Sequence, residues 1–287
     1  MTDTRTPVAV LGAGLIGVDL ADKIQRSPLL DCRLVVGRRE CLGLRRAAEM
    51  GCATSTGGLD SLLEAGPFDV VFDASNADDH AGHWARLHHT GATLIDLTPT
   101  QLGAVVVPTV NGDQALSHPH LNLVSCGGQA AIPLLHALAQ CCAPDYIEVV
   151  STAASASAGP ATRLNLDHYI ATTQAGIRFF TGAPEVKVML NLSPATPPPP
   201  FRVAMTVLAT QIQPEVVGPI VAAAAASVRA YAPGYAVTSL TVAQGRICVT
   251  AEVTAEGGRL PRYAGNLDII NAAAVLLAEQ YTAARSQ

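Results

Sequence analysis

The chain has 287 residues, of which 49% are hydrophobic and only 14% are charged. This length allows one large or two modest domains with their own cores, and the composition excludes an intrinsically disordered protein. The formal net charge is −5 and Lys and Arg form no stripe along the chain, so we expect no nucleic-acid partner.

The chain shows no targeting or membrane signal. No apolar run reaches the length needed to cross a bilayer, so we expect no membrane partner, and the short polar start lacks a signal-peptide pattern. The seven cysteines are odd in number and lack zinc-type spacing, which favours reduced thiols. We therefore expect a cytoplasmic protein.

A glycine-rich loop lies close to the N-terminus. The apolar run 8–11 precedes a GxGxxG motif, and a helix-type segment follows it. In that context the first glycine permits a tight turn, the second lets the backbone approach a pyrophosphate, and the third lets the helix pack on the strand. The helix N-terminus also attracts phosphate. The residues predicted to bind a dinucleotide are Gly12, Gly14, Leu15, Ile16 and Gly17.

Apolar runs continue along the first half of the chain at the spacing of alternating strands and helices. Strands are predicted at 32–36, 70–74, 93–97 and 121–124, with helices such as 42–50 and 80–89 between them. This rhythm is typical of a doubly wound parallel sheet, and so of a Rossmann domain.

The residues at the end of the second predicted strand indicate whether the cofactor is NAD or NADP. An NAD enzyme commonly places an acid there to bind the adenosine ribose. This chain has Arg38 and Arg39 at that place, and guanidinium groups suit the additional phosphate of NADP. Glu40 follows directly, so an NAD site in which Glu40 binds the ribose stays open.

Cys126 lies at a second junction between an apolar run and a helix-type segment. Ser125, Gly127 and Gly128 surround it, and the predicted helix covers 134–140. Helix N-terminal amides lower the pKa of a thiol and stabilise a developing oxyanion, so we predict a nucleophile with the amides around Gly127 and Gly128 as oxyanion donors. The alternative is a small buried cysteine in a tight turn.

Several motifs resemble the acylating acetaldehyde dehydrogenase family. They are 69–74 followed by His80, 95–99, 107–111, 125–130, 157–160, 162–167 and 265–269, and they cover nearly the whole chain in order. The resemblance implies an α/β fold with an N-terminal Rossmann domain, an α+β catalytic and dimerisation domain, and a last helix that returns to the Rossmann domain. The implied boundaries are 1–126 with 266–287 for the first domain and 127–265 for the second.

The resemblance also implies a reaction and its residues. Cys126 matches the nucleophile, which takes up an aldehyde as a thiohemiacetal, is oxidised to a thioester and passes the acyl group to CoA or a carrier thiol, or runs in reverse. Asn266 matches an asparagine near the nicotinamide and the thiol, and Ser157, Gly159 and Pro160 match a loop that faces the cofactor. The resemblance implies that the substrate is a small aldehyde, that the chain forms a homodimer or a higher oligomer, and that an aldolase is a possible partner protein.

The chain departs from the family pattern at several places, among them Ala161 in place of a Gly and the missing ribose acid after the second predicted strand. Ala156 stands where the family has Lys, and Val203 or Met205 stands where it has Asp, a candidate base. His168 and Tyr169 replace Glu-Phe. Because an unperturbed imidazole transfers protons near neutral pH, His168 is predicted to take the place of the missing base.

The eight histidines raise the question of a metal. His80, His83, His88 and His89 fall on one predicted helix, and His118 and His120 flank Pro119. None has a converging set of Cys or carboxylate residues in the sequence. We therefore expect surface or helix-face histidines and no metal site.

Two other functions stay open at this point. One is a semialdehyde or acyl-phosphate reductase of the same fold, which needs cationic residues near Cys126 and finds only Arg163 as a candidate. The other is a catalytically degenerate subunit that stabilises an aldolase. The lost Asp and Lys favour the second alternative, whereas Cys126 and the intact glycine loop oppose it.

Overall fold

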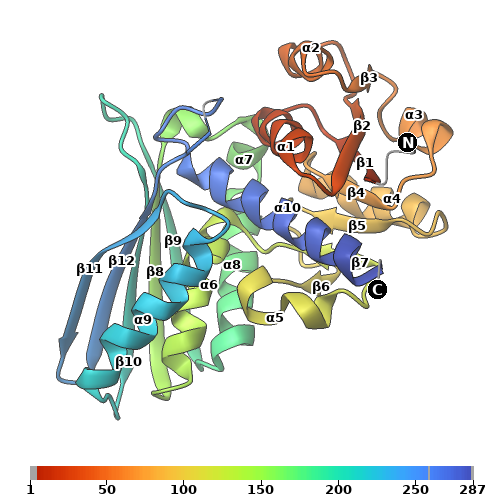
Figure 1. Cartoon of the computed structure of the whole chain (residues 1–287). Helices are drawn as coiled ribbons and strands as arrows, with labels where there is room; N and C mark the ends of the chain where they lie inside the picture. Colours follow the sequence, from red (N-terminus) through yellow and green to blue (C-terminus); the bar gives the residue numbers. More distant parts are fainter. Residues whose placement is uncertain (1–4, 258, 286–287) are drawn as a thin grey trace. The chain divides into compact units, whose positions relative to one another are not determined.

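A computed structural model describes residues 5–257 and 259–285 (Figure 1). They divide into two compact units. One unit runs to Leu123 and resumes at Asn271, and the other comprises Val124–Ile270. Each unit holds its own β-sheet, so the α/β architecture predicted from the sequence is confirmed.

The first unit is built on a seven-stranded sheet in which every strand pairing is parallel. The strand order is β3-β2-β1-β4-β5-β7-β6, so the order reverses between β1 and β4, as in a doubly wound fold. The strands are β1 (Thr6–Leu11), β2 (Leu30–Val36), β3 (Ala53–Ser55), β4 (Val70–Asp73), β5 (Thr93–Asp96), β6 (Ala104–Val105) and β7 (His120–Asn122). All four residues of β4 and of β5 are buried, as expected for a sheet covered on both faces.

The helices of this unit connect the parallel strands. They are α1 (Leu15–Arg26), α2 (Leu42–Glu49), α3 (Gly58–Ala65), α4 (Ala77–Leu87) and α5 (Pro108–Ala115). The helix predicted at 80–89 begins three residues earlier, at Ala77. Asp78 and Asp79 lie in its first turn, where their charge complements the helix dipole.

The second unit contains a five-stranded sheet in the order β11-β12-β10-β8-β9. Only the pairing of β8 with β9 is parallel. The strands are β8 (Pro144–Ala154), β9 (Glu185–Ser193), β10 (Phe201–Ala209), β11 (Tyr235–Ala243) and β12 (Arg246–Val253). The helices are α6 (Cys126–Ala139), the short η1 (Ser155–Ser157), α7 (Pro160–Leu164), α8 (Leu166–Thr181) and α9 (Pro214–Arg229).

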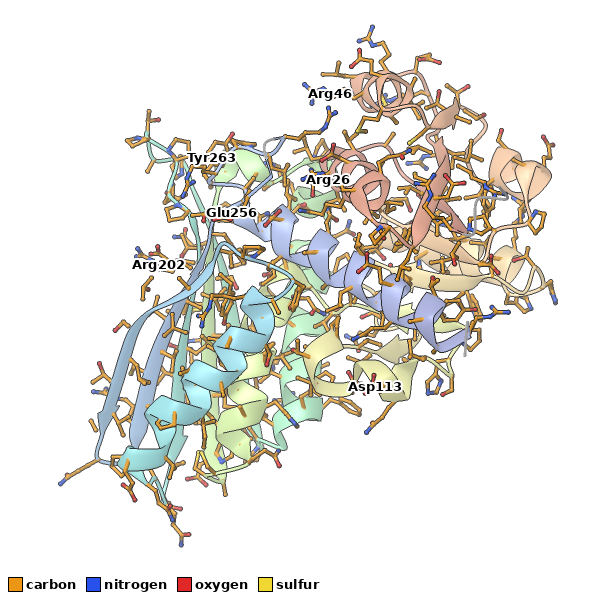
Figure 2. All side chains as sticks on the ribbon, viewed as in Figure 1. Arg26, Arg46, Asp113, Arg202, Glu256 and Tyr263 are labelled. Carbon is orange, nitrogen blue, oxygen red and sulfur yellow. The ribbon has the colours of Figure 1, made fainter. Side chains whose placement is uncertain are left out.

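Helices α6, α8 and α9 cover one face of this sheet, and Figure 1 shows no helix of this unit on the other face. The strand residues alternate accordingly: in β10 Phe201, Val203 and Met205 are buried, whereas Ala204 and Thr206 are partly exposed. Arg202 reaches out from the uncovered face (Figure 2), where it donates to Glu252 Oε1 from Nε at 2.8 Å.

The last helix, α10 (Gly265–Arg285), joins the first unit from Asn271 onward. Asn271 Nδ2 donates to the carboxylate of Asp19 at 2.8 Å and to the carbonyl of Ile16 at 3.1 Å, and both acceptors lie in α1. The predicted return of the last helix to the Rossmann domain is confirmed. Among the described residues, no helix combines the length and apolar character that a membrane span needs.

Candidate active site

The turn that leads to Cys126 has an unusual backbone torsion. Val124 has φ +62°, and among the described residues it is the one non-glycine residue with a positive φ. A β-branched residue is strained in this region. Its side chain is buried, and a Cβ atom added at Gly128 or Gly176 would lie 2.7 or 2.9 Å from Val124 Cγ1. The two glycines therefore leave the space in which Val124 packs.

Ser125 caps the helix that carries the cysteine. Its Oγ accepts a hydrogen bond from the Gly128 N–H at 2.9 Å, and it lies 2.6 Å from Thr173 Oγ1 in α8. Helix α6 thus begins at Cys126, eight residues earlier than the helix predicted at 134–140. Because the cap also uses the Gly128 amide, the prediction that this amide stabilises an oxyanion is wrong for this conformation.

Tyr169 of α8 is the side chain that meets the thiol. Its hydroxyl oxygen lies 3.7 Å from Cys126 Sγ and accepts a hydrogen bond from the Gly127 N–H at 3.1 Å. A Cβ atom on Gly127 would lie 2.3 Å from that hydroxyl and 2.6 Å from Ser151 Oγ. Gly127 therefore provides the room that lets the phenol reach the cysteine.

Burial and hydrogen bonding act on the thiol in opposite directions. Burial raises the pKa of Cys126 to about 11, although the Tyr169 hydroxyl and the N–H groups of Gly127 and Cys126 itself favour the thiolate. The expectation that helix amides would give a low thiol pKa is therefore wrong for this state, because desolvation outweighs them. Burial also raises the pKa of Tyr169 well above its usual range, so the phenol stays protonated and can donate a hydrogen bond.

His168 does not take part in this arrangement. Its side chain is exposed, and its Nδ1 lies 3.5 Å from Asn165 Oδ1. Successive residues on a helix point about 100° apart, so the helix face that brings Tyr169 to Cys126 turns His168 away. The prediction of His168 as the base is corrected to Tyr169 as the polar partner of the thiol. The signal in the sequence was the hydroxyl gained where the family has Phe.

The glycine loop of the first unit has the features that a dinucleotide site needs. Gly12 has φ +113°, and a Cβ on Gly17 would lie 1.8 Å from the Gly12 carbonyl oxygen, so larger residues are excluded at both places. Gly14 caps α1 without a side-chain hydrogen bond, and a Cβ added there meets nothing within 4 Å. The backbone at the N-terminus of α1 is thus open to a ligand, and such a helix terminus fits a pyrophosphate. In the first turn of α1, Leu15 is 47% exposed and Ile16 is partly exposed.

Arg38 and Arg39 follow β2, and both are exposed. The guanidinium of Arg38 lies 3.1 Å from the carboxylate of Asp79, in the first turn of α4. Arg38 is therefore positioned near the end of β2 but already has an anionic partner, with which a 2′-phosphate would compete. Glu40 is exposed as well.

The loop of Ser157, Gly159 and Pro160 lies between β8 and α8. Ser157 is buried and donates from Oγ to the Ala154 carbonyl at 2.8 Å, and a Cβ on Gly159 would meet nothing within 4 Å. Pro160 is exposed at the start of α7. Arg163 donates to Ser155 O and Oγ, at 2.8 Å each, so it holds this loop.

Asn266 is buried at the start of α10. Its Oδ1 has no hydrogen-bond partner among the described residues. A buried amide oxygen without a partner is costly, and a carboxamide N–H of a nicotinamide fits such an acceptor.

Two of the histidines are not surface residues. His80 is fully buried and His120 is 7% exposed, and they converge with the buried carboxylates of Asp73 and Asp96. Burial raises the pKa of Asp96 to about 6 and lowers that of His120 to about 4. The expectation of histidines without converging carboxylates is wrong here, because neighbouring parallel strands bring together residues that lie far apart in the sequence.

Comparison with known proteins identifies the family. Residues 126–261 match a family model described as prokaryotic acetaldehyde dehydrogenase, dimerisation. The chain is 52% identical to acetaldehyde dehydrogenase of Streptomyces griseus subsp. griseus, over 99% of this chain and 94% of the relative. It is 40% identical to acetaldehyde dehydrogenase of Pectobacterium atrosepticum, over 98% and 97% of the two chains. The chain belongs to the acetaldehyde dehydrogenase family.

Solved structures agree on the fold. Aspartate semialdehyde dehydrogenase II from Vibrio cholerae aligns with a TM-score of 0.66 at 16% identity, covering 96% of this chain and 98% of that chain. A probable aspartate-semialdehyde dehydrogenase from Pseudomonas aeruginosa aligns with a TM-score of 0.69 at 14% identity and the same coverage. The family resemblance and the two-domain fold predicted from the sequence motifs are both confirmed.

The open space above Gly14 gives a direct test of the dinucleotide site. Gly14→Ala is expected to weaken NAD(P)H binding at least tenfold, because its methyl group occupies the path of the pyrophosphate. It should cost at most about 1 kcal/mol of folding free energy, since Ala is a poorer helix cap than Gly. Fluorescence titration of NADH and NADPH, together with urea unfolding, measures both effects.

The matched control is Gly82→Ala, inside α4, where an added Cβ also meets nothing within 4 Å. It should stabilise the protein by roughly 0.5–1 kcal/mol and leave cofactor binding unchanged. Equal cofactor affinity in Gly14→Ala and the wild type would contradict the assignment of the loop.

Proposed function

We propose that the chain is a nicotinamide-dependent acylating aldehyde dehydrogenase that carries its acyl group on Cys126. The observation that supports this is the partly buried cysteine at the N-terminus of α6, with the Tyr169 hydroxyl 3.7 Å from its sulfur and the Gly127 N–H donating to that hydroxyl. The glycine loop of the first unit supplies the matching cofactor site. A catalytically degenerate subunit would have no need to keep both the cysteine site and the glycine loop.

The first step forms a bond between Cys126 Sγ and the aldehyde carbon, while the thiol proton passes to solvent water and the C=O π pair moves onto the oxygen. The carbonyl oxygen becomes an oxyanion, and the Tyr169 O–H is the donor placed to stabilise it in the thiohemiacetal. The Gly127 N–H donates to the Tyr169 hydroxyl oxygen and so holds that group beside the sulfur. When bound, the nicotinamide accepts the hydride that leaves the carbon as the thioester forms. Gly12, Gly14 and Gly17 would hold the pyrophosphate of the cofactor, and Asn266 would accept a hydrogen bond from its carboxamide.

The second step transfers the acyl group. The thiol of CoA, or of a carrier-protein phosphopantetheine, attacks the thioester carbon and releases Cys126 as the leaving group. The reverse reaction reduces a thioester to the free aldehyde with the same residues. An acyl-phosphate reductase is less well supported, because Arg163 is already engaged by Ser155.

The assembly and the setting of the enzyme are part of the proposal. The uncovered face of the five-stranded sheet, with β10 at its centre between β12 and β8, supports a homodimer or higher oligomer. An aldolase partner that delivers the aldehyde stays a prediction. The seven cysteines are free thiols, which supports a reducing compartment such as the cytoplasm.

The acyl-enzyme itself is the decisive test of the function. Incubation with an aldehyde and oxidised cofactor, without CoA, should add the mass of one acyl group to the wild type and none to Cys126→Ser. Serine cannot replace the thiol, because a hydroxyl needs an added base to become a nucleophile. Intact-mass spectrometry with peptide mapping locates the group, and CoA should remove it. An acylated Cys126→Ser protein, or a wild type that never acylates, would refute the assignment.

Tyr169 is predicted to stabilise the thiolate. Tyr169→Phe removes one hydrogen bond to a charged sulfur, worth about 1.5–3 kcal/mol, so the pKa of Cys126 should rise by about one to two units. The pH dependence of alkylation by iodoacetamide measures that pKa. Tyr146→Phe, in β8, is the matched control and should leave the profile unchanged. A Tyr169→Phe profile identical to that of the wild type would show that the hydroxyl does not act on the sulfur.

The cofactor preference follows from the residues after β2. If Arg38 and Arg39 bind a 2′-phosphate at roughly 1.5–3 kcal/mol, NADPH should bind about 10- to 100-fold more tightly than NADH. Replacing both arginines by Ala should remove that preference. Asp79→Asn should increase it, because it frees Arg38 from its carboxylate partner. Parallel titrations of NADH and NADPH measure the ratio, and tighter NADH binding in the wild type would favour Glu40 as the ribose ligand.

A further inference from the structure

The first unit contains a cluster of buried polar side chains that the aldehyde chemistry does not use. His80 Nε2, Asp96 Oδ2 and His120 Nε2 all lie within 4.8 Å of one another. The two imidazole nitrogens are 2.8 Å apart, and His80 Nε2 is 3.2 Å from Asp96 Oδ2. His80 and Asp96 have no exposed surface. Imidazole nitrogen and carboxylate oxygen are both ligand atoms of divalent transition metals such as zinc.

Each of the three residues is held in place by its own element. Asp96 ends β5 and His120 begins β7, which are neighbours in the parallel sheet, and His80 comes from α4. The Asp96 Oδ1 atom accepts hydrogen bonds from the Thr98 N–H at 2.7 Å and the Thr98 hydroxyl at 2.6 Å. The ring of Trp84 stacks on that of His120 at 4.4 Å. The ligand atoms are therefore preorganised.

Asp73 fixes the tautomer of His80. Its Oδ2 lies 2.7 Å from His80 Nδ1 and 2.8 Å from His83 Nδ1, and Oδ1 accepts from the Ser75 N–H at 3.0 Å. A carboxylate at this distance holds a proton on Nδ1, so Nε2 presents its lone pair to the cluster. A carboxylate bonded to the far nitrogen of a metal-binding histidine is the usual second layer of a metal site.

This arrangement leaves acceptor atoms facing one another. With its proton on Nδ1, His80 directs a lone pair at Asp96 Oδ2, which is itself an acceptor. A proton on His120 Nε2 satisfies the contact between the histidines but not this one. Asp96 Oδ2 already accepts hydrogen bonds from Thr100 Oγ1 at 2.5 Å and from Asn122 Nδ2 at 2.9 Å, which hold it in place beside the two imidazoles. A cation between the three atoms removes the repulsion between the lone pair of His80 and this carboxylate, and buried charges are ordinarily paired or bound to metal.

We propose that His80, His120 and Asp96 form a binding site for one zinc-type divalent ion, with Asp73 as the group that orients His80. In a tetrahedral site with bonds near 2.0–2.1 Å, the ligand atoms are about 3.3 Å apart, so the observed contacts need to open by only a few tenths of an ångström. Three protein ligands leave the fourth position for a water molecule. The ion would link α4, β5 and β7, because each of these elements supplies one ligand. The alternative occupant is a proton shared by the same atoms.

Metal uptake by the full-length protein tests the proposal. Protein freed of metal by dialysis against a chelator is titrated with Zn²⁺ in competition with a fluorescent indicator. The wild type should bind one Zn²⁺ per chain, and its Tm should rise, because an ion that binds only the folded state stabilises it. Co²⁺ should give the visible absorption of a tetrahedral site without a thiolate charge-transfer band.

Two matched variants show whether zinc binds at this cluster or at other residues of the chain. His120→Asn removes a ligand and should weaken zinc binding at least a hundredfold, whereas His118→Asn changes an exposed histidine two residues away and should leave it unchanged. Circular dichroism confirms that both variants are folded. Three outcomes would overturn the proposal: no uptake by the wild type, which would leave a shared-proton network; equal uptake by His120→Asn; or a thiolate charge-transfer band, which would place the metal on a cysteine.

Discussion

The position of the nucleophile depends on one backbone torsion, the left-handed φ of Val124. Such a conformation costs about 1–3 kcal/mol, and burying a valine side chain contributes about 1.5–3 kcal/mol in return. That burial is available only because Gly128 and Gly176 leave the space. The two glycines after the cysteine thus have different tasks. Gly127 makes room for the Tyr169 hydroxyl, and Gly128 makes room for Val124 while its amide binds the Ser125 cap.

Burial has a second consequence, which is chemical. Because its pKa is raised, the resting thiol stays mostly protonated at pH 7, since each pH unit below the pKa lowers the thiolate fraction about tenfold. The resting cysteine is therefore protected from indiscriminate alkylation and oxidation, which proceed through the thiolate. Reaction then requires a hydrogen-bond donor that strengthens as charge develops, and the Tyr169 phenol, held by the Gly127 N–H, lies beside the sulfur.

Local pattern was enough to predict the strands β1, β2, β4, β5 and β7 of the first unit, the glycine loop and the helix junction at Cys126, because each depends on residues adjacent in the sequence. The short strands β3 and β6 were not predicted. Two features could not be predicted in this way. The contact of Tyr169 with Cys126 depends on the rotation of α8 against α6, and a one-residue difference on a helix decides whether His168 or Tyr169 faces the thiol. The convergence of His80, Asp96 and His120 depends on strand order in the sheet. Neither the helix rotation nor the strand order is encoded in sequence spacing.

The buried cluster of His80, Asp96 and His120 also supports the nucleotide-binding loop, because Asp73 at the end of β4 connects the two. A Cβ on Gly12 would lie 2.5 Å from the Ala74 carbonyl oxygen, so the loop packs directly on the residue that follows Asp73. Burial alone would raise the pKa of Asp73, but hydrogen bonds from His80 and His83 hold it well below its usual range and keep the carboxylate charged. Those bonds anchor the backbone on which Gly12 rests. The charge that occupies the cluster, proton or metal, therefore also stabilises the surface against which the dinucleotide loop is built.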